Sequence, residues 1–376
     1  MKKLFSILLA ATMTLSLMAC SSSSDSTTTT TETTATEAVD ETVAEITAAL
    51  GDADTSELML EHFVYNFSDA QQNAVMNACK VIYEAAGINY NFNDGGGIQS
   101  TQNDQIDNAI QKGATMLVVG MADISSAQNV VDKAKSAGIP ILFYNQQPDE
   151  DIIQSYDQCW FVGSDARGGG LMQGEMAATT ILADYDAYDR NGDGVIQYVM
   201  IRSDLSHAEA NGRTEAAVTR TNELFAEAGM PALEQMGTDY LADDWSTNKG
   251  KDCMDTFLTA NPISATEGVE LVFANNDSIA IGAIQALQTM GWNQSADKAV
   301  PVLGVDATDE AKTYIDAGTM LGSAGQDPEL IAEYVATVAF NVFTGGEPLD
   351  GTDWAFEDGT KDIFFPYSPY PTDLIG

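Results

Sequence analysis

Short apolar runs alternate with amphipathic stretches along the first half of the chain. Strands are expected at 58–67, 88–92, 116–119 and 139–144, and helices at 70–86, 104–112 and 125–137. The predicted strands are short, mainly apolar runs, whereas the helical stretches are amphipathic. This alternation of strand and helix predicts a parallel sheet covered on both faces.

A second series of the same kind begins near Val162. It predicts helices at 170–182, 213–228, 247–260 and 278–289, with strands at 196–201, 269–274 and 300–305. The fold class expected is therefore α/β, with two Rossmann-like lobes in tandem. In such open sheets the ligand crevice lies at the carboxyl ends of the strands, so the residues that follow each strand are the candidates for function.

The N-terminal 55 residues follow a different pattern. Residues 1–20 combine two lysines, an apolar stretch and a small-residue cleavage site before Cys20, which predicts a lipoprotein signal peptide. Lipidation of the Cys20 thiol would anchor the protein to the outer face of a membrane. The alternative is an ordinary secretory signal with a chance cysteine. Residues 21–55 are rich in Ser, Thr, Ala and acidic residues and predict a disordered tether.

Charge and cysteine content exclude several kinds of partner and site. The formal charge of −40, from 56 acidic and 16 basic residues, argues against nucleic acid as a partner. Cys79, Cys159 and Cys253 form no CxxC pair or Cys/His cluster, so we expect three buried structural thiols. The chain has only two histidines and no Gly-x-Ser-x-Gly elbow, which argues against nucleophilic catalysis.

One loop has the spacing of a calcium site. Oxygen-bearing side chains occupy loop positions 1, 3, 5 and 9, with glycine at position 6: Asp189, Asn191, Asp193, Gln197 and Gly194. Position 12, where an EF-hand has a glutamate, is Met200, and a strand-like run follows the loop. A calcium ion would therefore need a carboxylate from elsewhere in the chain. The alternative is an Asp/Asn/Gly surface turn without a metal.

Polar residues follow the predicted strands in both series. They are Asn145, His207, Glu209, Arg213, the run 275–277 with Asn276, and Asp306. Each Asn or Asp could instead cap a helix. Together they supply the fixed donors and acceptors that sugar hydroxyls need, and Trp245 is the candidate flat partner for the C–H face of a sugar.

Several motifs resemble a known family. They are Asp189 to Gln197, Ser206 to Arg213, Val272 to Gly282, Leu303 to Ala307 and Gln102 to Asp107. From Leu58 to Tyr367 the chain resembles the periplasmic galactose/glucose-binding proteins of ABC sugar importers, which are type I periplasmic binding proteins. The resemblance implies two lobes, 56–164 plus 327–363 and 165–326 plus 364–376, joined by three crossings near Ser164, Gln326 and Phe364.

The resemblance also implies the binding residues. Glu270 would be the missing calcium carboxylate, and Val195 would add its backbone oxygen. The sugar-binding positions implied are Asp69, Asn145, His207, Arg213, Trp245, Asn276 and Asp306. Three further positions depart from the family pattern: Gln71 replaces a second aromatic ring, Glu209 an aspartate and Gln326 an asparagine. These departures leave the identity of the sugar open.

The function implied is binding, not catalysis. A monomeric, lipid-anchored receptor with a structural calcium ion would close on a monosaccharide and deliver it to a membrane permease. Alternatives are a different sugar such as a pentose, or a sensor for chemotaxis or two-component signalling. A cytoplasmic sugar-responsive repressor shares the two-lobe fold but requires a basic helix-turn-helix, which the acidic N-terminal segment does not supply.

Overall fold

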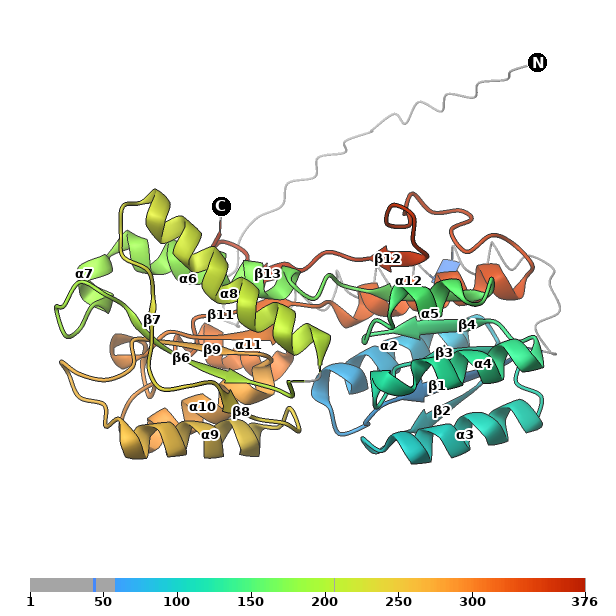
Figure 1. Cartoon of the computed structure of the whole chain (residues 1–376), viewed down its shortest axis with the longest axis horizontal. Helices are drawn as coiled ribbons and strands as arrows, with labels where there is room; N and C mark the ends of the chain where they lie inside the picture. Colours follow the sequence, from blue (N-terminus) through green and yellow to red (C-terminus); the bar gives the residue numbers. More distant parts are fainter. Residues whose placement is uncertain (1–42, 45–57, 206, 376) are drawn as a thin grey trace, which may run out of the picture.

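The structure is a computed structural model that describes residues 43–44, 58–205 and 207–375 of the chain (Figure 1). The predicted signal peptide, its lipidation site Cys20 and most of the predicted tether lie outside these residues. Within the tether, Val43 is partly buried and packs against the apolar core of the first lobe. At this position the predicted tether is in contact with the folded protein.

The first lobe is built on a six-stranded parallel sheet in the order β12-β5-β4-β3-β1-β2. Its strands are β1 (Met59–Val64), β2 (Asn89–Asp94), β3 (Met116–Val119), β4 (Ile141–Tyr144), β5 (Cys159–Gly163) and β12 (Asp362–Phe364). Its helices are α2 (Ala70–Ala85), α3 (Gln99–Gln111), η2 (Ile124–Ser126), α4 (Ala127–Ala137), α5 (Glu150–Gln154) and α12 (Pro328–Phe343). Apolar residues of α2 and α12 cover one face, and those of α3, α4 and α5 cover the other.

The second lobe has a seven-stranded sheet in the order β13-β11-β10-β9-β6-β7, with β8 paired to β6. Its strands are β6 (Gln197–Arg202), β7 (Glu234–Gln235), β8 (Tyr240–Leu241), β9 (Leu271–Ala274), β10 (Val302–Asp306), β11 (Gly322–Gly325) and β13 (Ser368–Tyr370). Its helices are α6 (Gly168–Ala183), α7 (Tyr185–Tyr188), α8 (Ala208–Glu227), α9 (Thr247–Ala260), α10 (Asp277–Thr289), η3 (Ala296–Lys298) and α11 (Asp309–Asp316). Only β13 runs antiparallel to its neighbour.

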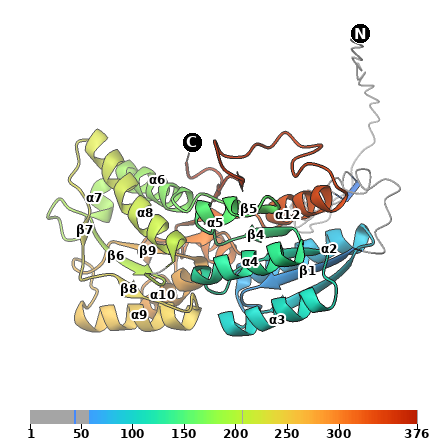
Figure 2. The same cartoon turned by 45° about the vertical axis from the view of Figure 1, so that its right-hand side comes forward.

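The chain crosses between the two lobes after β5, after β11 and after β12, as Figures 1 and 2 show from two sides. The crossings expected near Ser164, Gln326 and Phe364 fall at these three connections. The predicted fold class, α/β with two Rossmann-like lobes, is confirmed. None of the described helices is long and apolar enough to span a bilayer.

Two helices begin about one turn earlier than the apolar pattern predicted. α3 begins at Gln99 instead of 104, and α8 begins at Ala208 instead of 213. The first turns of both helices carry polar side chains that are buried by tertiary contacts. Gln102, for example, is fully buried and donates from Nε2 to the Gly120 carbonyl at 2.8 Å. A pattern of apolar residues cannot register such a turn.

The three thiols differ in exposure. Cys79 and Cys159 are buried and free, as predicted. The prediction for Cys253 is wrong, because this residue of α9 is only half-buried. α9 lies on the outer surface of its sheet, and Gly250, Met254, Phe257 and Leu258 form its buried face. Cys253 lies at the margin of that face.

Candidate functional site

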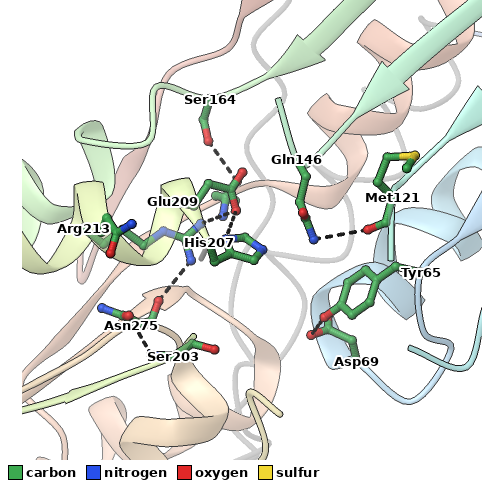
Figure 3. Close-up of polar contacts among 12 residues, drawn as sticks. Tyr65, Asp69, Met121, Gln146, Ser164, Ser203, His207, Glu209, Arg213 and Asn275 are labelled. Carbon is green, nitrogen blue, oxygen red and sulfur yellow. Dashed lines mark hydrogen bonds and ion pairs between the residues drawn. The ribbon is translucent and has the colours of Figure 1, made fainter. Parts of the chain in front are cut away.

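A cavity between the lobes brings together all ten side chains that the sequence singled out for sugar. They are Asp69, Gln71, Asn145, His207, Glu209, Arg213, Trp245, Asn276, Asp306 and Gln326, and Tyr65 and Gln72 complete the lining. The cavity is narrow, with a volume of about 30 Å³, which is room for about two water molecules. Figure 3 shows part of this lining, with Tyr65 and Asp69 on one side and His207, Glu209 and Arg213 on the other.

On the side of the first lobe, the cavity wall is the loop after β1 and the start of α2. Asp69 caps α2, because its Oδ1 accepts from the Gln72 backbone N–H at 2.8 Å. Its Oδ2 accepts from the Tyr65 hydroxyl at 2.5 Å (Figure 3). Gln71 donates from Nε2 to the backbone oxygen of Gln326 at 2.7 Å. The amide that replaces the family's aromatic ring is therefore fixed to the hinge.

On the side of the second lobe, Trp245 provides the aromatic surface. The His207 ring meets it edge-on, with centroids 4.9 Å apart and planes at 67°. Asn276 caps α10 through Oδ1, which accepts from the Ile279 backbone N–H at 2.9 Å, and its Nδ2 donates to the Trp245 carbonyl at 3.3 Å. Asn276 is thus both a helix cap and part of the cavity lining, so the two interpretations of this residue are compatible.

The cavity gathers carboxyl groups around one guanidinium. Arg213 is buried, with Nη2 3.9 Å from Glu209 Oε2 and Nη1 donating to the Asn275 carbonyl at 3.0 Å. Burial raises the pKa of Glu209 to about 7, although Arg213 acts to lower it. Burial also raises the pKa of Asp306 well above its usual range, again against the effect of Arg213. One cation therefore does not offset the desolvation of two carboxylates.

His207 is a further cavity residue whose pKa is shifted by burial. Burial and the charge of Arg213 lower its pKa to about 4, so the imidazole is neutral near pH 7. A neutral imidazole has one donor and one acceptor nitrogen, and both can serve a hydroxyl group. This property suits an uncharged polyhydroxyl ligand.

Three polar atoms of the lining are buried without a hydrogen-bond partner in the protein. They are Gln72 Oε1, His207 Nδ1 and Arg213 Nε. A buried polar atom without a partner costs about 1–3 kcal/mol. Such atoms gather where a ligand supplies the missing hydrogen bonds.

The backbone is strained at the same place. Five non-glycine residues in the described part of the chain have positive φ angles, and three of them line the cavity: Asn145 at 68°, Trp245 at 62° and Asp306 at 111°. Positive φ is tolerated by Asn and Asp but is rare for a bulky residue such as Trp. Strain of this kind clusters at functional sites, where the surrounding structure maintains it.

Sequence reasoning missed four residues of the site. Tyr65 and Gln72 line the cavity, and Ser164 and Tyr367 hydrogen-bond to lining residues. Tyr65 directly follows β1, so the rule of strand ends could have identified it. Ser164, Gln72 and Tyr367 carry no local signal, because their positions depend on how the three crossings pack.

The predicted calcium residues also lie together. Asp189 Oδ1 accepts from the backbone N–H groups of Gly192 and Asp193, and Oδ2 accepts from that of Gly194. Glu270, which precedes β9, reaches the loop from a neighbouring strand. Its Oε1 accepts from the Arg190 N–H at 2.7 Å, and its Oε2 accepts from the Gln197 N–H at 2.9 Å.

The donor set of this loop is of the type that calcium prefers. It contains three carboxylates and the side-chain oxygens of Asn191 and Gln197, and these two amides are linked to each other and to Asp193 by hydrogen bonds of 2.9–3.0 Å. Hard oxygen ligands of this kind fit Ca²⁺. In the described residues, however, no three acidic, His or Cys side chains converge as a metal-binding cluster. The calcium site stays a prediction.

The comparisons with known proteins agree with this architecture. Residues 61–347 match the family model described as periplasmic binding protein domain. The chain is 30% identical over 318 residues to the D-galactose/methyl-galactoside binding periplasmic protein of Haemophilus influenzae, covering 83% of this chain and 87% of that one.

Solved structures show the same fold at lower identity. One is an ABC transporter solute binding protein from Bacillus halodurans with bound myo-inositol, at 24% identity and a TM-score of 0.65, covering 84% of this chain and 95% of that chain. Another is a periplasmic solute binding protein from Actinobacillus succinogenes with bound D-allose, at 18% identity and a TM-score of 0.69, covering 84% and 98%. The resemblance read from the sequence motifs is confirmed, and this chain belongs to the periplasmic binding protein family.

Proposed function

We propose that this protein is an extracytoplasmic receptor that binds a monosaccharide and delivers it to an ABC importer. The observation that carries the proposal is the cavity between the lobes, where Trp245 faces a set of buried amides, carboxylates and one guanidinium. A sugar needs a flat apolar partner for its C–H face and many fixed hydrogen-bond partners for its hydroxyls. The galactose-binding relative from Haemophilus influenzae supports the same ligand class.

The mechanism is binding coupled to closure. Both lobes and the hinge contribute lining residues, for example Asp69 from the first lobe, Arg213 from the second and Gln326 from a crossing. A ligand that contacts both lobes binds the closed arrangement more tightly and shifts the population toward it. The permease then recognises the closed form.

The preferred sugar is a hexose of the galactose or glucose type or a smaller relative. Gln71 supplies an amide where the family has a second ring, so stacking on the sugar is one-sided. Glu209 and Gln326 are each one methylene longer than the residues they replace and reduce the space between the lobes. A pentose such as xylose or arabinose is the alternative ligand.

A receptor is favoured over an enzyme. The two carboxyl groups of the cavity with raised pKa, Glu209 and Asp306, are held by Arg213 and Gln326 instead of by a nucleophile or a second acid. Glycosidase chemistry requires a pair of carboxyl groups placed on either side of a scissile bond. Incubation of the best-binding sugar with the protein should return the sugar unchanged.

Calcium and the lipid anchor complete the proposal. Asp189, Asn191, Asp193, Gln197 and Glu270, with the backbone oxygen of Val195, would hold a structural calcium ion that fastens the loop to the strand beside it. Lipidation of Cys20 would keep the receptor at the outer face of the membrane next to its permease. The metal would be structural, because none of these residues lines the cavity.

The test is a thermal-shift panel of monosaccharides on the full mature chain. A ligand that binds only the native state raises the melting temperature with its occupancy, so the best sugar ranks first. We expect a clear shift with at least one of galactose, glucose, xylose and arabinose. No shift with any of the four would contradict monosaccharide binding.

A further inference from the structure

Each of the three crossings contributes one polar side chain to a single hydrogen-bonded chain. Ser164 follows β5, Gln326 follows β11 and Tyr367 lies between β12 and β13. Ser164 Oγ lies 3.1 Å from Gln326 Oε1 and 2.9 Å from the Tyr367 hydroxyl oxygen. Ser164 and Gln326 are both buried. The three segments that must move together when the lobes rotate are therefore joined by side chains as well as by backbone.

The two ends of this hydrogen-bonded series are the guanidinium of Arg213 and the carboxyl group of Asp306. Arg213 Nη2 lies 3.5 Å from the Tyr367 hydroxyl oxygen, and Gln326 donates from Nε2 to Asp306 Oδ1 at 3.0 Å. A branch ties in the first lobe, because Gln71 donates to the backbone oxygen of Gln326 at 2.7 Å. A guanidinium and a carboxyl group that face the cavity are thus connected through the hinge.

The number of protons on each group fixes which partner donates in each hydrogen bond of the series. A guanidinium can only donate, so Arg213 donates to Tyr367. Gln326 uses its NH₂ group on Asp306, so its amide oxygen accepts, and the single Ser164 proton goes to it. The Tyr367 proton then goes to Ser164. Every hydroxyl in the chain both donates and accepts, and such chains strengthen cooperatively in a buried setting.

We propose that Ser164, Gln326 and Tyr367 form a hinge lock that couples the angle between the lobes to the positions of Arg213 and Asp306. Ser164 and Tyr367 do not line the cavity described above. They act on the ligand only through Arg213 and Asp306 and are therefore positioning residues. The inference rests on the proposed function, since positioning matters only if the cavity binds a ligand. These hydrogen bonds hold the three crossings in one arrangement relative to one another.

The Tyr367 ring offers a clean variant. It packs directly over Gly168 and Gly169 at the start of α6, where an added Cβ would lie 2.9 Å and 3.1 Å from ring carbons. Tyr367→Phe keeps this packing and removes only the hydroxyl. Ser164→Ala removes the next link. The control is Tyr90→Phe. The hydroxyl of Tyr90 donates to Glu84 at the surface of the first lobe.

The experiment measures affinity, dissociation rate and small-angle scattering of the full mature chain with its best-binding sugar. We expect Tyr367→Phe and Ser164→Ala each to weaken binding about fivefold, through faster dissociation. The double variant should bind the sugar as tightly as either single variant, because the loss of one hydrogen bond already interrupts the series. The ranking of sugars should stay unchanged. Ligand-free samples of both variants should have a larger radius of gyration than the wild type and Tyr90→Phe.

Three results would overturn the hinge lock. The first is that both single variants bind the sugar with wild-type affinity and have the wild-type radius of gyration, even if their free energy of unfolding falls. The second is losses that multiply in the double variant, and the third is a changed sugar ranking, which would make these residues ligand contacts. If the wild type binds no sugar while the ligand-free variants still expand, the proposed function fails and the hinge lock stands.

Discussion

In the loop at residues 189–197, carboxylates accept hydrogen bonds from backbone N–H groups, and Glu270 receives two of them from Arg190 and Gln197. In the cavity between the lobes, Glu209 is buried at 3.9 Å from Arg213, and three neighbouring polar atoms have no protein partner. Both regions are acidic and rich in amides. One satisfies its polar groups internally, and the other leaves them to be satisfied from outside.

A polar cluster with a structural role therefore differs from one that binds a ligand. Composition does not distinguish them, since both contain Asp, Glu, Asn and Gln. The difference lies in hydrogen-bond satisfaction and in burial without compensation. The same substitution, Glu to Gln, should therefore have opposite effects on stability in the two regions.

Glu209→Gln should stabilise the ligand-free protein at high pH. The folded-state pKa of about 7 lies above the ordinary value of 4.5, so the stabilising protonated form is fully present below about pH 4.5 and is lost as the pH rises through 7. Relative to the wild type, the variant should gain up to about 3 kcal/mol at pH 8 and nothing at pH 4.5. Urea unfolding at both values measures this, and sugar binding should weaken.

The matched control is Glu227→Gln, on the exposed C-terminal end of the same helix. It should leave the free energy of unfolding unchanged at both pH values. A Glu209→Gln variant that is no more stable than the wild type at pH 8 would show that Arg213 compensates the buried carboxylate. The contrast between the two regions would then disappear.

Glu270→Gln should destabilise the protein by about 2 kcal/mol, because the amide that replaces one carboxylate oxygen cannot accept from a backbone N–H. Burial raises the pKa of Glu270, and the backbone donors act in the opposite direction. Thermal unfolding with calcium and with chelator measures the effect. The wild type should lose stability on chelation, and the variant should be indifferent to it.

Glu267→Gln, three residues earlier and exposed, is the control for this loop and should behave as the wild type. Indifference of the wild type to chelator would contradict the calcium proposal and leave the loop as a surface turn. Sugar affinity should be unaffected in either variant, since neither residue lines the cavity.

Gln71→Phe should give the smallest change in free energy among these variants, and it tests whether the ligand contacts this side of the cavity. A second ring opposite Trp245 should tighten binding of a pyranose about fivefold, as expected for one aromatic contact. Gln71→Leu loses the same hydrogen bond to Gln326 without adding a ring, and it should bind less tightly than Gln71→Phe. Titration calorimetry measures both. Equal affinities for the two variants would mean that the ligand does not stack on this side.

Most strands and helices could be predicted from the sequence, because periodicity reports which faces are apolar. The elements that follow β10, among them the apolar helix α12, were not predicted. Two predicted helices begin earlier than expected, because their first turns carry polar contacts in place of apolar ones. The first turn of α3 holds Gln102 against Gly120, and the first turn of α8 carries Glu209 into the cavity. Cys253 was placed in the core because an amphipathic pattern marks a buried stripe but not its edges.

The candidate site was predictable to the extent that its residues follow strands. Asn145 directly follows β4, Asn276 lies two residues after β9, and Asp306 is the last residue of β10. Parallel strands bring such positions to one edge of each sheet. Asp69, Gln71 and Gln326 were reached only through the family resemblance. The positive φ of Trp245 has no signal in the sequence, because the surrounding packing enforces it.

The two α/β lobes, the loop at Asp189 and the polar ends of the strands can be recognised from the sequence, because each depends on residues close together in the chain. Which polar groups remain unsatisfied, and which meet across the hinge, depends on how distant segments pack. Ser164 and Tyr367 are 203 positions apart and touch within one hydrogen bond. Contacts of this kind follow from the packing of three separate crossings, and no local pattern of residues encodes them.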